Sequence, residues 1–323
     1  MPEGDSLYRA AQRLQALVGE RVSVEAPHPI AAAKGIAPRL DGKRIEAVEA
    51  VGKNLLLRFE GGLTLRSHLK MKGRWWVHPH GWNLGDGKPW LVLRGATHEA
   101  VLWHGPALEL DDSVRRRLGP DILAEPPDFD AMLANLRALP QDTRLGEALQ
   151  TQRAIAGVGN MWTAEALWDA RLSPWLTLHE TIDDELRTVL DSAARLMHES
   201  ARGARTVKPV HRRAGRPCSR CGGTIGSRPL GDAARMAYCC PGCKAGFCLR
   251  VGAYTGFVGV LAQQNRRGFA LRSARTPASP VCLRKRTEER ARPRSNERRG
   301  FARAAPLPSA PRFLPRCVPR ALR

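Results

Sequence analysis

The sequence contains no hydrophobic run long enough to cross a membrane. A spanning helix needs about 20 consecutive apolar residues, and the best candidate, Val251–Leu261, is short and broken by three glycines. Residues 1–20 also lack the continuous apolar segment of a secretory signal peptide. With 323 residues, 43% of them hydrophobic, the chain is long enough for two or more globular domains. We therefore predict a cytoplasmic multidomain protein with no membrane partner.

Acidic residues are scarce beside basic ones: 31 Asp and Glu stand against 52 Lys and Arg, which gives a net charge of +21. Such an excess indicates a polyanionic partner, most simply nucleic acid. The excess is uneven, because residues 245–323 hold 17 Arg and one Lys against three Glu. Residues 1–244 are only mildly basic, so the net charge says little about what the folded body binds.

Cysteine is absent from residues 1–217, whereas six of the eight cysteines fall between 218 and 248. This clustering is typical of a metal site rather than of a disulfide framework in a secreted domain. Cys218 and Cys221 form one Cys-x-x-Cys pair, and Cys240 and Cys243 form another after 18 intervening residues. Two such turns supply the four thiolates of a tetrahedral structural Zn²⁺ site. Cys239 competes with Cys240 as third ligand, and the Cys-Pro-Gly-Cys turn favours Cys240.

The first residues of the chain form a candidate catalytic site. Removal of Met1 would leave Pro2 with a free secondary amine next to the carboxylate of Glu3. The pKa of an α-amino group is about 7.7–8.0, so a useful fraction is neutral near pH 7 and can attack an aldehyde-level carbon to form an iminium. Glu3 could then transfer protons. The alternative is that Pro2 and Glu3 simply open a helix.

Hydrophobic periodicity predicts that helix over Asp5–Val18, capped by Asp5 and holding the N-terminus against a core. Short β-rich runs separated by Gly, Pro and Asp follow it and indicate an antiparallel sandwich. The predicted strands are Arg21–Ala26, Arg44–Val51, Asn54–Phe59, Leu63–Leu69, Trp75–His78, Trp90–Leu93 and Ala100–Trp103. Lys53 falls at the turn between the second and third of these strands.

The segment His68–Arg74 is a basic loop that contains Leu69 and Met71. It could be a solvated connection with both apolar side chains in the core. It could also be an apolar wedge that enters a DNA stack between phosphate-binding cations.

A Pro-rich linker over Leu118–Pro127 separates the predicted strands from predicted helices. The helices are expected at Phe129–Ala138, Arg144–Ile155, Met161–Arg171 and Asp183–Ala201. Between the second and third lies Gly157-Val158-Gly159-Asn160. Gly157 can end one helix and Asn160 can cap the next, and the same backbone N–H groups could bind phosphate.

The cysteine pairs flank a predicted hairpin over Thr224–Tyr238, with the basic side chain of Arg235 on its return strand. Beyond it, the Arg-, Pro- and Ser-rich segment 249–323 has no sustained periodicity and is predicted to be disordered. This tail could strengthen nonspecific DNA binding through counterion release, or it could have no function.

Together, these motifs resemble the formamidopyrimidine-DNA glycosylase/endonuclease VIII family, and most of all the bacterial endonuclease VIII branch. The resemblance covers residues 1–244. It rests on Pro2–Asp5, Gly52–Leu56, His68–Arg74, Leu118–Asp121, Gly157–Asn160 and Tyr238–Cys243. Two departures are the long basic tail and Cys239, which stands where an aromatic residue is expected.

The resemblance implies an α+β multidomain protein with DNA between its two halves. The expected domains are an N-terminal catalytic β-sandwich with its N-terminal helix (1–118), a helix–two-turns–helix DNA-binding domain (126–210), a zinc ribbon (211–248) and the basic tail (249–323). The implied protein is a monomer that binds damaged double-stranded DNA and one structural Zn²⁺.

The implied activity is that of a bifunctional DNA glycosylase/AP lyase of base-excision repair. It would remove oxidised pyrimidines through a Schiff base on Pro2 and nick the strand by β,δ-elimination. By resemblance, Glu3 protonates the ring oxygen of the sugar, and Lys53 contacts phosphate and assists proton transfer. Arg235 is implied as a fourth catalytic residue, and it also binds DNA. The implied DNA contacts are Asn160 and Arg235 at the phosphates, Gly157 and Gly159 through the turn, and Leu69 and Met71 in the gap left by the flipped base.

Two alternatives remain at this point. The same chemistry could act on oxidised purines, since base choice depends on pocket loops. The chain could also be a nonenzymatic zinc-ribbon DNA-binding protein, although Pro2, Glu3 and Lys53 are all present.

Overall fold

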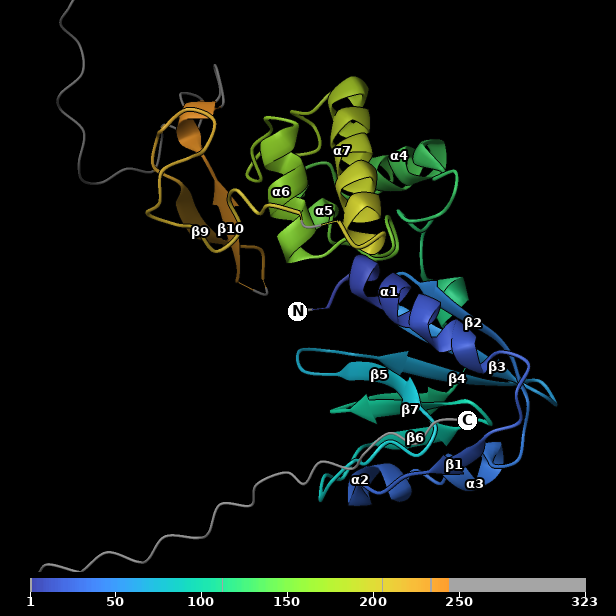
Figure 1. Ribbon diagram of the computed structural model, residues 1–323. Coiled ribbons are helices and arrows are strands. Elements are labelled where there is room, and N and C mark those ends of the chain that lie inside the picture. Colours follow the sequence, from blue (N-terminus) through green and yellow to red (C-terminus); the bar gives the residue numbers. More distant parts are fainter. Residues whose placement is uncertain (1, 112, 205, 233, 244–323) are drawn as a thin grey trace, which may run out of the picture. The chain divides into compact units, whose positions relative to one another are not determined.

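The computed structural model describes residues 2–111, 113–204, 206–232 and 234–243. These residues belong to one compact unit (Figure 1). The tail predicted over 249–323 lies outside the described residues, so its predicted disorder stays a prediction.

The N-terminal helix α1 covers Gly4–Leu14 and continues as a 3₁₀ turn, η1, over Gln15–Leu17. Its buried face, which includes Leu7, Leu14 and Leu17, packs into the core of the strand-rich part. The helix also contacts α7 (Asp183–Ala201) of the helical part. The predicted helix is confirmed in place, but the prediction that Asp5 caps it is wrong, because Asp5 lies inside the first turn.

Two four-stranded antiparallel sheets enclose that core, which confirms the predicted sandwich (Figure 1). One sheet has the order β1 (Ser23–Glu25), β6 (Leu91–Arg94), β7 (His98–Trp103), β5 (Arg74–Pro79). The other has the order β2 (Ile45–Val51), β3 (Asn54–Phe59), β4 (Leu63–His68), β8 (Ala107–Leu110). The four-residue strand β8 was not predicted. Two short helices, α2 (Pro29–Ala32) and α3 (Ala37–Leu40), follow β1.

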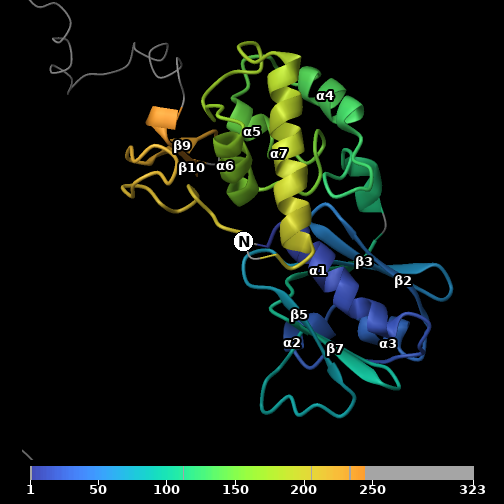
Figure 2. The same ribbon diagram turned by 45° about the horizontal axis from the view of Figure 1, so that its top comes forward.

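The second part is helical. It contains η2 (Ser113–Arg117), α4 (Phe129–Arg137), α5 (Leu145–Ala148), α6 (Asn160–Asp169) and α7 (Asp183–Ala201). Helix α7 contacts both α4 and α6, and Figure 2 shows it as the long yellow helix beside α6.

The prediction of a helix over Arg144–Ile155 is wrong, because α5 ends at Ala148 and the chain continues in turns. The side chain of Gln152 explains the change. Its amide donates to the carbonyls of Gln150 and Val158 at 2.9 and 2.8 Å, and its carbonyl oxygen accepts from the N–H of Gly157 at 3.1 Å. Side-chain bonds of this kind compete with the helical ladder.

The third part is a hairpin of β9 (Gly226–Leu230) and β10 (Arg235–Cys239), followed by a 3₁₀ turn, η3, over Pro241–Cys243. The hairpin is the predicted one, and β10 contacts α6. Together with the two sandwich sheets and the helices, it confirms the predicted α+β architecture.

Candidate active site and DNA interface

Glu3 lies where the N-terminal segment meets the start of α6. Its carboxylate is 2% exposed. It accepts hydrogen bonds from the N–H groups of Gly159, Met161 and Trp162 at 3.0, 2.9 and 3.2 Å. Burial raises the pKa of Glu3, and the backbone bonds from Met161 and Trp162 and the charge of Lys53 oppose the rise. A carboxylate here also complements the positive end of the helix dipole.

Glu3 therefore caps α6 from a part of the sequence 156 residues away. We predicted Asn160 as the cap, and this is wrong: the N-cap position belongs to Gly159, and Asn160 is the first helical residue. The side chain of Asn160 is thereby left available for other contacts.

Glycines make this close approach possible. A Cβ on Gly159 would lie only 2.4 Å from Cδ of Glu3. The N–H of Gly4 donates to the carbonyl of Gly157 at 3.0 Å, and Gly157 has a φ of +98°, which a side chain disfavours. These contacts fix the backbone directly after Pro2, whose own ring is half-buried.

Lys53 lies at the β2–β3 turn, as predicted, and is 9% exposed. Gly52 before it has a φ of +57° and donates its N–H to Asp121 at 2.6 Å. The pKa of Lys53 is lowered to about 8, chiefly because the side chain is buried; the charge of Glu3 opposes the fall and the charge of Arg235 adds to it. A lysine with such a pKa can exchange a proton near neutral pH.

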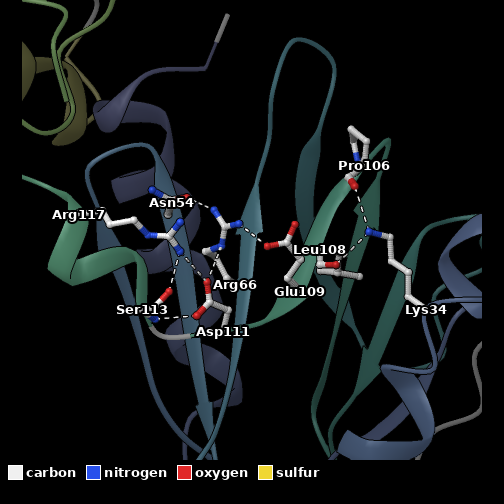
Figure 3. A network of polar contacts seen from close by, with 9 residues as sticks. All are labelled: Lys34, Asn54, Arg66, Pro106, Leu108, Glu109, Asp111, Ser113 and Arg117. Carbon is white, nitrogen blue, oxygen red and sulfur yellow. Dashed lines mark hydrogen bonds and ion pairs between the residues drawn. The ribbon is translucent and has the colours of Figure 1, made fainter. Parts of the chain in front are cut away.

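A polar network fixes the strand that follows Lys53 (Figure 3). The side-chain oxygen Oδ1 of Asn54 accepts a hydrogen bond from the guanidinium of Arg66 at 3.2 Å. Arg66 forms ion pairs with Glu109 and Asp111, and Asp111 also pairs with Arg117 at 3.3 Å. The network ties β3, β4, β8 and η2 together, so the turn that carries Lys53 has a rigid base.

Asn160 and Arg235 meet at the contact between α6 and the hairpin. The amide of Asn160 donates to the carbonyl of Met236 at 3.0 Å. The guanidinium of Arg235 is exposed and donates to the side-chain carbonyl of Gln150 at 2.9 Å. Two residues predicted from distant motifs therefore lie in one hydrogen-bond network.

Four thiols converge at the base of the hairpin. The Sγ atoms of Cys218, Cys221, Cys240 and Cys243 all lie within 4.8 Å of one another. At a metal–sulfur distance of about 2.3 Å, tetrahedral geometry separates the sulfurs by roughly 3.8 Å, so this set fits a metal ion. Cys239 is buried outside the cluster.

Family models match most of the described chain. Residues 1–116 match the formamidopyrimidine-DNA glycosylase N-terminal domain, and residues 118–210 match the H2TH domain of the same enzymes. The chain belongs to the formamidopyrimidine-DNA glycosylase/endonuclease VIII family. As a member of this family it is a bifunctional DNA glycosylase and AP lyase of base-excision repair.

Within the family the chain is most like endonuclease VIII. It is 35% identical over 279 residues to a probable endonuclease 8 2 of Streptomyces coelicolor, covering 79% of this chain and 98% of the relative. It is 33% identical over 269 residues to the DNA-(apurinic or apyrimidinic site) lyase Nei2 of Mycolicibacterium smegmatis, covering 76% and 99%.

A solved structure shows the same fold. The Lactococcus lactis formamidopyrimidine-DNA glycosylase, bound non-covalently to DNA that contains an AP site, matches with a TM-score of 0.64 and 23% identity. The match covers 76% of this chain and all of that one. In the part of the chain that the structure describes, no helix combines the length and the apolar character that a membrane span requires.

The loop after β4 contains the two apolar residues predicted as a wedge, Leu69 and Met71, and it buries one of them and exposes the other. Leu69 is 4% exposed and packs in the sandwich core, whereas Met71 is 68% exposed. The turn is tight, since a Cβ on Gly73 would lie 2.5 Å from the carbonyl oxygen of Leu69. The buried position of Leu69 does not fit the expected DNA contact, and Met71 alone stays a candidate for it.

Two further carboxyl groups are buried in this enzyme: Asp5, which we predicted only as a helix cap, and Glu165, which we did not predict. Asp5 accepts from the indole of Trp162 at 3.0 Å and the hydroxyl of Ser200 at 2.8 Å. Glu165 accepts from the N–H of His211 at 2.8 Å, and burial raises its pKa to about 7. The signal for Glu165 in the sequence was a carboxylate among the mostly apolar residues 161–168 of α6.

Proposed function

We propose that this enzyme removes oxidised bases, pyrimidines in preference, by covalent catalysis on the amine of Pro2. The observation that carries the proposal is the arrangement at the N-terminus. Half-buried Pro2 precedes Glu3, whose buried carboxylate is held by three backbone N–H groups. Lys53, with a pKa of about 8, lies close enough to Glu3 for their charges to interact.

The reaction starts with a nucleotide turned out of the duplex, because the enzyme cannot reach C1′ inside the stack. After Met1 is removed, the neutral amine of Pro2 attacks C1′, and the bond from C1′ to the base breaks. The base leaves with the bonding electrons and takes up the proton that the Pro2 nitrogen loses. Glu3, whose pKa is raised by burial, protonates the ring oxygen, so the bond from C1′ to that oxygen breaks, the sugar opens and a cationic iminium forms.

The iminium is an electron sink that acidifies the hydrogens on C2′. Loss of one C2′ proton, assisted by neutral Lys53, expels the 3′ phosphate with the bonding electrons of its C–O bond. A second elimination expels the 5′ phosphate. Water then releases the sugar remnant from Pro2 and restores the amine.

In this proposal the residues around Pro2 and Glu3 bind the DNA. Asn160 and Arg235 bind the phosphates beside the lesion, and the turn over Gly157–Gly159 contributes backbone donors. Met71 fills the gap left by the flipped base, for which its 68% exposure makes it available. Damaged double-stranded DNA is the partner and the enzyme acts as a monomer in the cytoplasm.

The ion at the four-cysteine cluster is one structural Zn²⁺ in this proposal, held by Cys218, Cys221, Cys240 and Cys243. The all-sulfur donor set supports zinc over magnesium or calcium, which prefer oxygen ligands. The ion stabilises the hairpin that carries Arg235. The proposal keeps the predicted domain bounds: 1–118 for the catalytic β-sandwich, 126–210 for the helix–two-turns–helix domain and 211–248 for the zinc ribbon.

Borohydride trapping tests the nucleophile. Reduction of the iminium during reaction with an abasic duplex should give a covalent protein–DNA adduct on Pro2, located by peptide mass spectrometry. Pro2→Ala keeps a primary α-amine, so its adduct should form at least about tenfold more slowly, and an N-acetylated chain should form none. Equal trapping by the acetylated chain would rule out Pro2 as the nucleophile.

A panel of lesions tests the base preference. The names of the two relatives, an endonuclease 8 and a Nei2 lyase, support the pyrimidine branch. We expect duplexes with thymine glycol to be cleaved faster than duplexes with 8-oxoguanine. The reverse order would make the enzyme an oxidised-purine glycosylase, and binding without any adduct or nick would make it a DNA-binding protein only.

A further inference from the structure

Gln150 links the two side chains to which the proposed function assigns phosphate binding. Its side-chain carbonyl accepts a hydrogen bond from Arg235 at 2.9 Å. Its amide donates to the carbonyl of Gly146 at 2.7 Å and approaches the side-chain oxygen of Asn160 at 3.5 Å. Gln150 lies in the turn after α5, Asn160 opens α6, and Arg235 opens β10, so three elements meet at this one side chain.

These bonds determine how both side chains are presented. Asn160 has its oxygen toward Gln150 and its amide on the carbonyl of Met236 at 3.0 Å, so its orientation is defined at both ends. Gln150 engages only one terminal nitrogen of Arg235. A guanidinium has five N–H donors, so the remaining donors of Arg235 can form a two-point contact with phosphate.

The neutral character of Gln150 matters as much as its position. A cavity of about 210 Å³ beside it is also lined by Glu147 and Arg235. Among the described residues, Arg235 forms no ion pair with a carboxylate. An amide oxygen orients the guanidinium without cancelling its charge, whereas a carboxylate in the same place would compete with phosphate for it.

We propose that Gln150 is a positioning residue that orients Arg235 and Asn160 toward one DNA phosphate beside the lesion. This inference rests on the proposed function, which assigns the two phosphate contacts. Gln150 itself does not touch DNA or the reacting atoms. Its contact with Asn160 is the longer one, at 3.5 Å against 2.9 Å for Arg235, so its effect on DNA binding passes chiefly through Arg235. A merely structural role of Gln150 would not depend on Arg235.

A double-mutant cycle on the full-length, metal-loaded protein tests the inference. The dissociation constant is measured for a duplex with a tetrahydrofuran abasic analogue, and the trapping rate for an abasic duplex. We expect Gln150→Ala to weaken binding by about tenfold, the effect of a misplaced charged hydrogen-bond donor. In an Arg235→Ala background, the same substitution should change binding by less than about twofold, because contacting residues are coupled.

A second variant separates positioning from packing. Gln150→Glu keeps the size of the side chain but places a negative charge on Arg235. It should bind more weakly than Gln150→Ala, and its binding should fall less steeply with salt. If Gln150 only fills space, Gln150→Glu should bind better than Gln150→Ala, and that order would overturn the inference.

Gln141→Ala is the matched control. Gln141 lies in the same helical part and donates only to the carbonyls of Arg137 and Leu139, both at 2.8 Å. It should leave DNA binding unchanged. Equal losses for Gln150→Ala with and without Arg235, or no loss from Arg235→Ala, would overturn the role of Gln150. Failure of the proposed function would appear separately, as the absence of a Pro2 adduct in the unmodified enzyme.

Discussion

Two buried charged groups, Glu3 and Lys53, define the site at the scale of single residues. Burial disfavours the charged form of each group, so it raises the pKa of Glu3 and lowers the pKa of Lys53. Their mutual attraction opposes both shifts. Burying two ionisable groups close together lowers the stability of the fold. Such groups are common in active sites where a proton must be transferred near neutral pH.

Lys53→Met should make the protein more stable and less active. The pKa of Lys53 is about 8 in the folded protein against 10.5 as its ordinary value. The unfolded chain therefore binds more protons between these pH values, and the stability of the unsubstituted protein should rise with pH across that window. At pH 7 the variant should be more stable by about 1–3 kcal/mol. Urea unfolding from pH 7 to 10.5 measures this.

The advantage of Lys53→Met should shrink as pH rises toward 10.5, and its cleavage of abasic DNA should be at least about 100-fold slower. Lys88 is exposed, so Lys88→Met should alter neither property. A Lys53→Met variant that is less stable than the unsubstituted protein at pH 7 would show that Lys53 contributes a net favourable interaction instead.

At the scale of elements, the site is assembled from ends and turns rather than from the middles of helices and strands. The start of α1, the β2–β3 turn, the start of α6 and the start of β10 each contribute one functional group. The hairpin β9–β10 is small and has few apolar contacts of its own, chiefly with Ala164, Val210 and Ile225. A hairpin of this size is marginally stable alone, and a metal ion bound by the four-cysteine cluster would stabilise it.

Cys218→Ser should remove the metal and weaken DNA binding without altering the N-terminal amine. Loss of one thiolate opens the cluster, so Arg235 is no longer held near Gln150 and Asn160. We expect less than about 0.2 zinc per chain by atomic emission and at least about tenfold weaker DNA binding. Cys239→Ser is the control and should retain about one zinc per chain. Full metal retention by Cys218→Ser would refute the four-cysteine ligand set.

At the scale of the whole molecule, most of the net charge of +21 lies in residues 245–323, beyond the described part of the chain. The residues of the proposed chemistry lie within residues 2–243, whereas residues 245–323 contribute most of the positive charge. Polycations increase the affinity for any DNA sequence by releasing counterions. Such a contribution would affect search and retention on DNA rather than the chemical step.

Truncation after residue 248 should therefore weaken binding to undamaged DNA and reduce its dependence on salt. The trapping rate at saturating abasic DNA should stay within about twofold of the full chain, because the reacting groups are untouched. Fluorescence titrations between 50 and 200 mM salt provide the measurement, and a full-length chain with the tail arginines changed to Gln is the matched control. Equal affinities for all three proteins would show that the tail has no role in DNA binding.

Local sequence patterns were sufficient to predict several helices and strands of this protein. Helix α7 begins and ends where its periodicity predicts, β3 covers the predicted residues, and the hairpin between the cysteine pairs is present. Alternation, periodicity and ligand spacing each depend on a few neighbouring residues, so the sequence reveals them. The helix predicted over Arg144–Ile155 failed because Gln152 forms side-chain bonds that no propensity describes.

The sequence by itself determined the sandwich, the helical part, the cysteine cluster and the family to which the chain belongs. Only the tertiary structure decided that Glu3 caps α6, that Leu69 is buried while Met71 is exposed, and that Gln150 joins Asn160 to Arg235. The physical reason is the separation, along the sequence, of the residues that make each contact. Periodicity depends on residues that are close in the sequence, whereas these contacts join residues as much as 159 positions apart, and packing of the whole chain selects them.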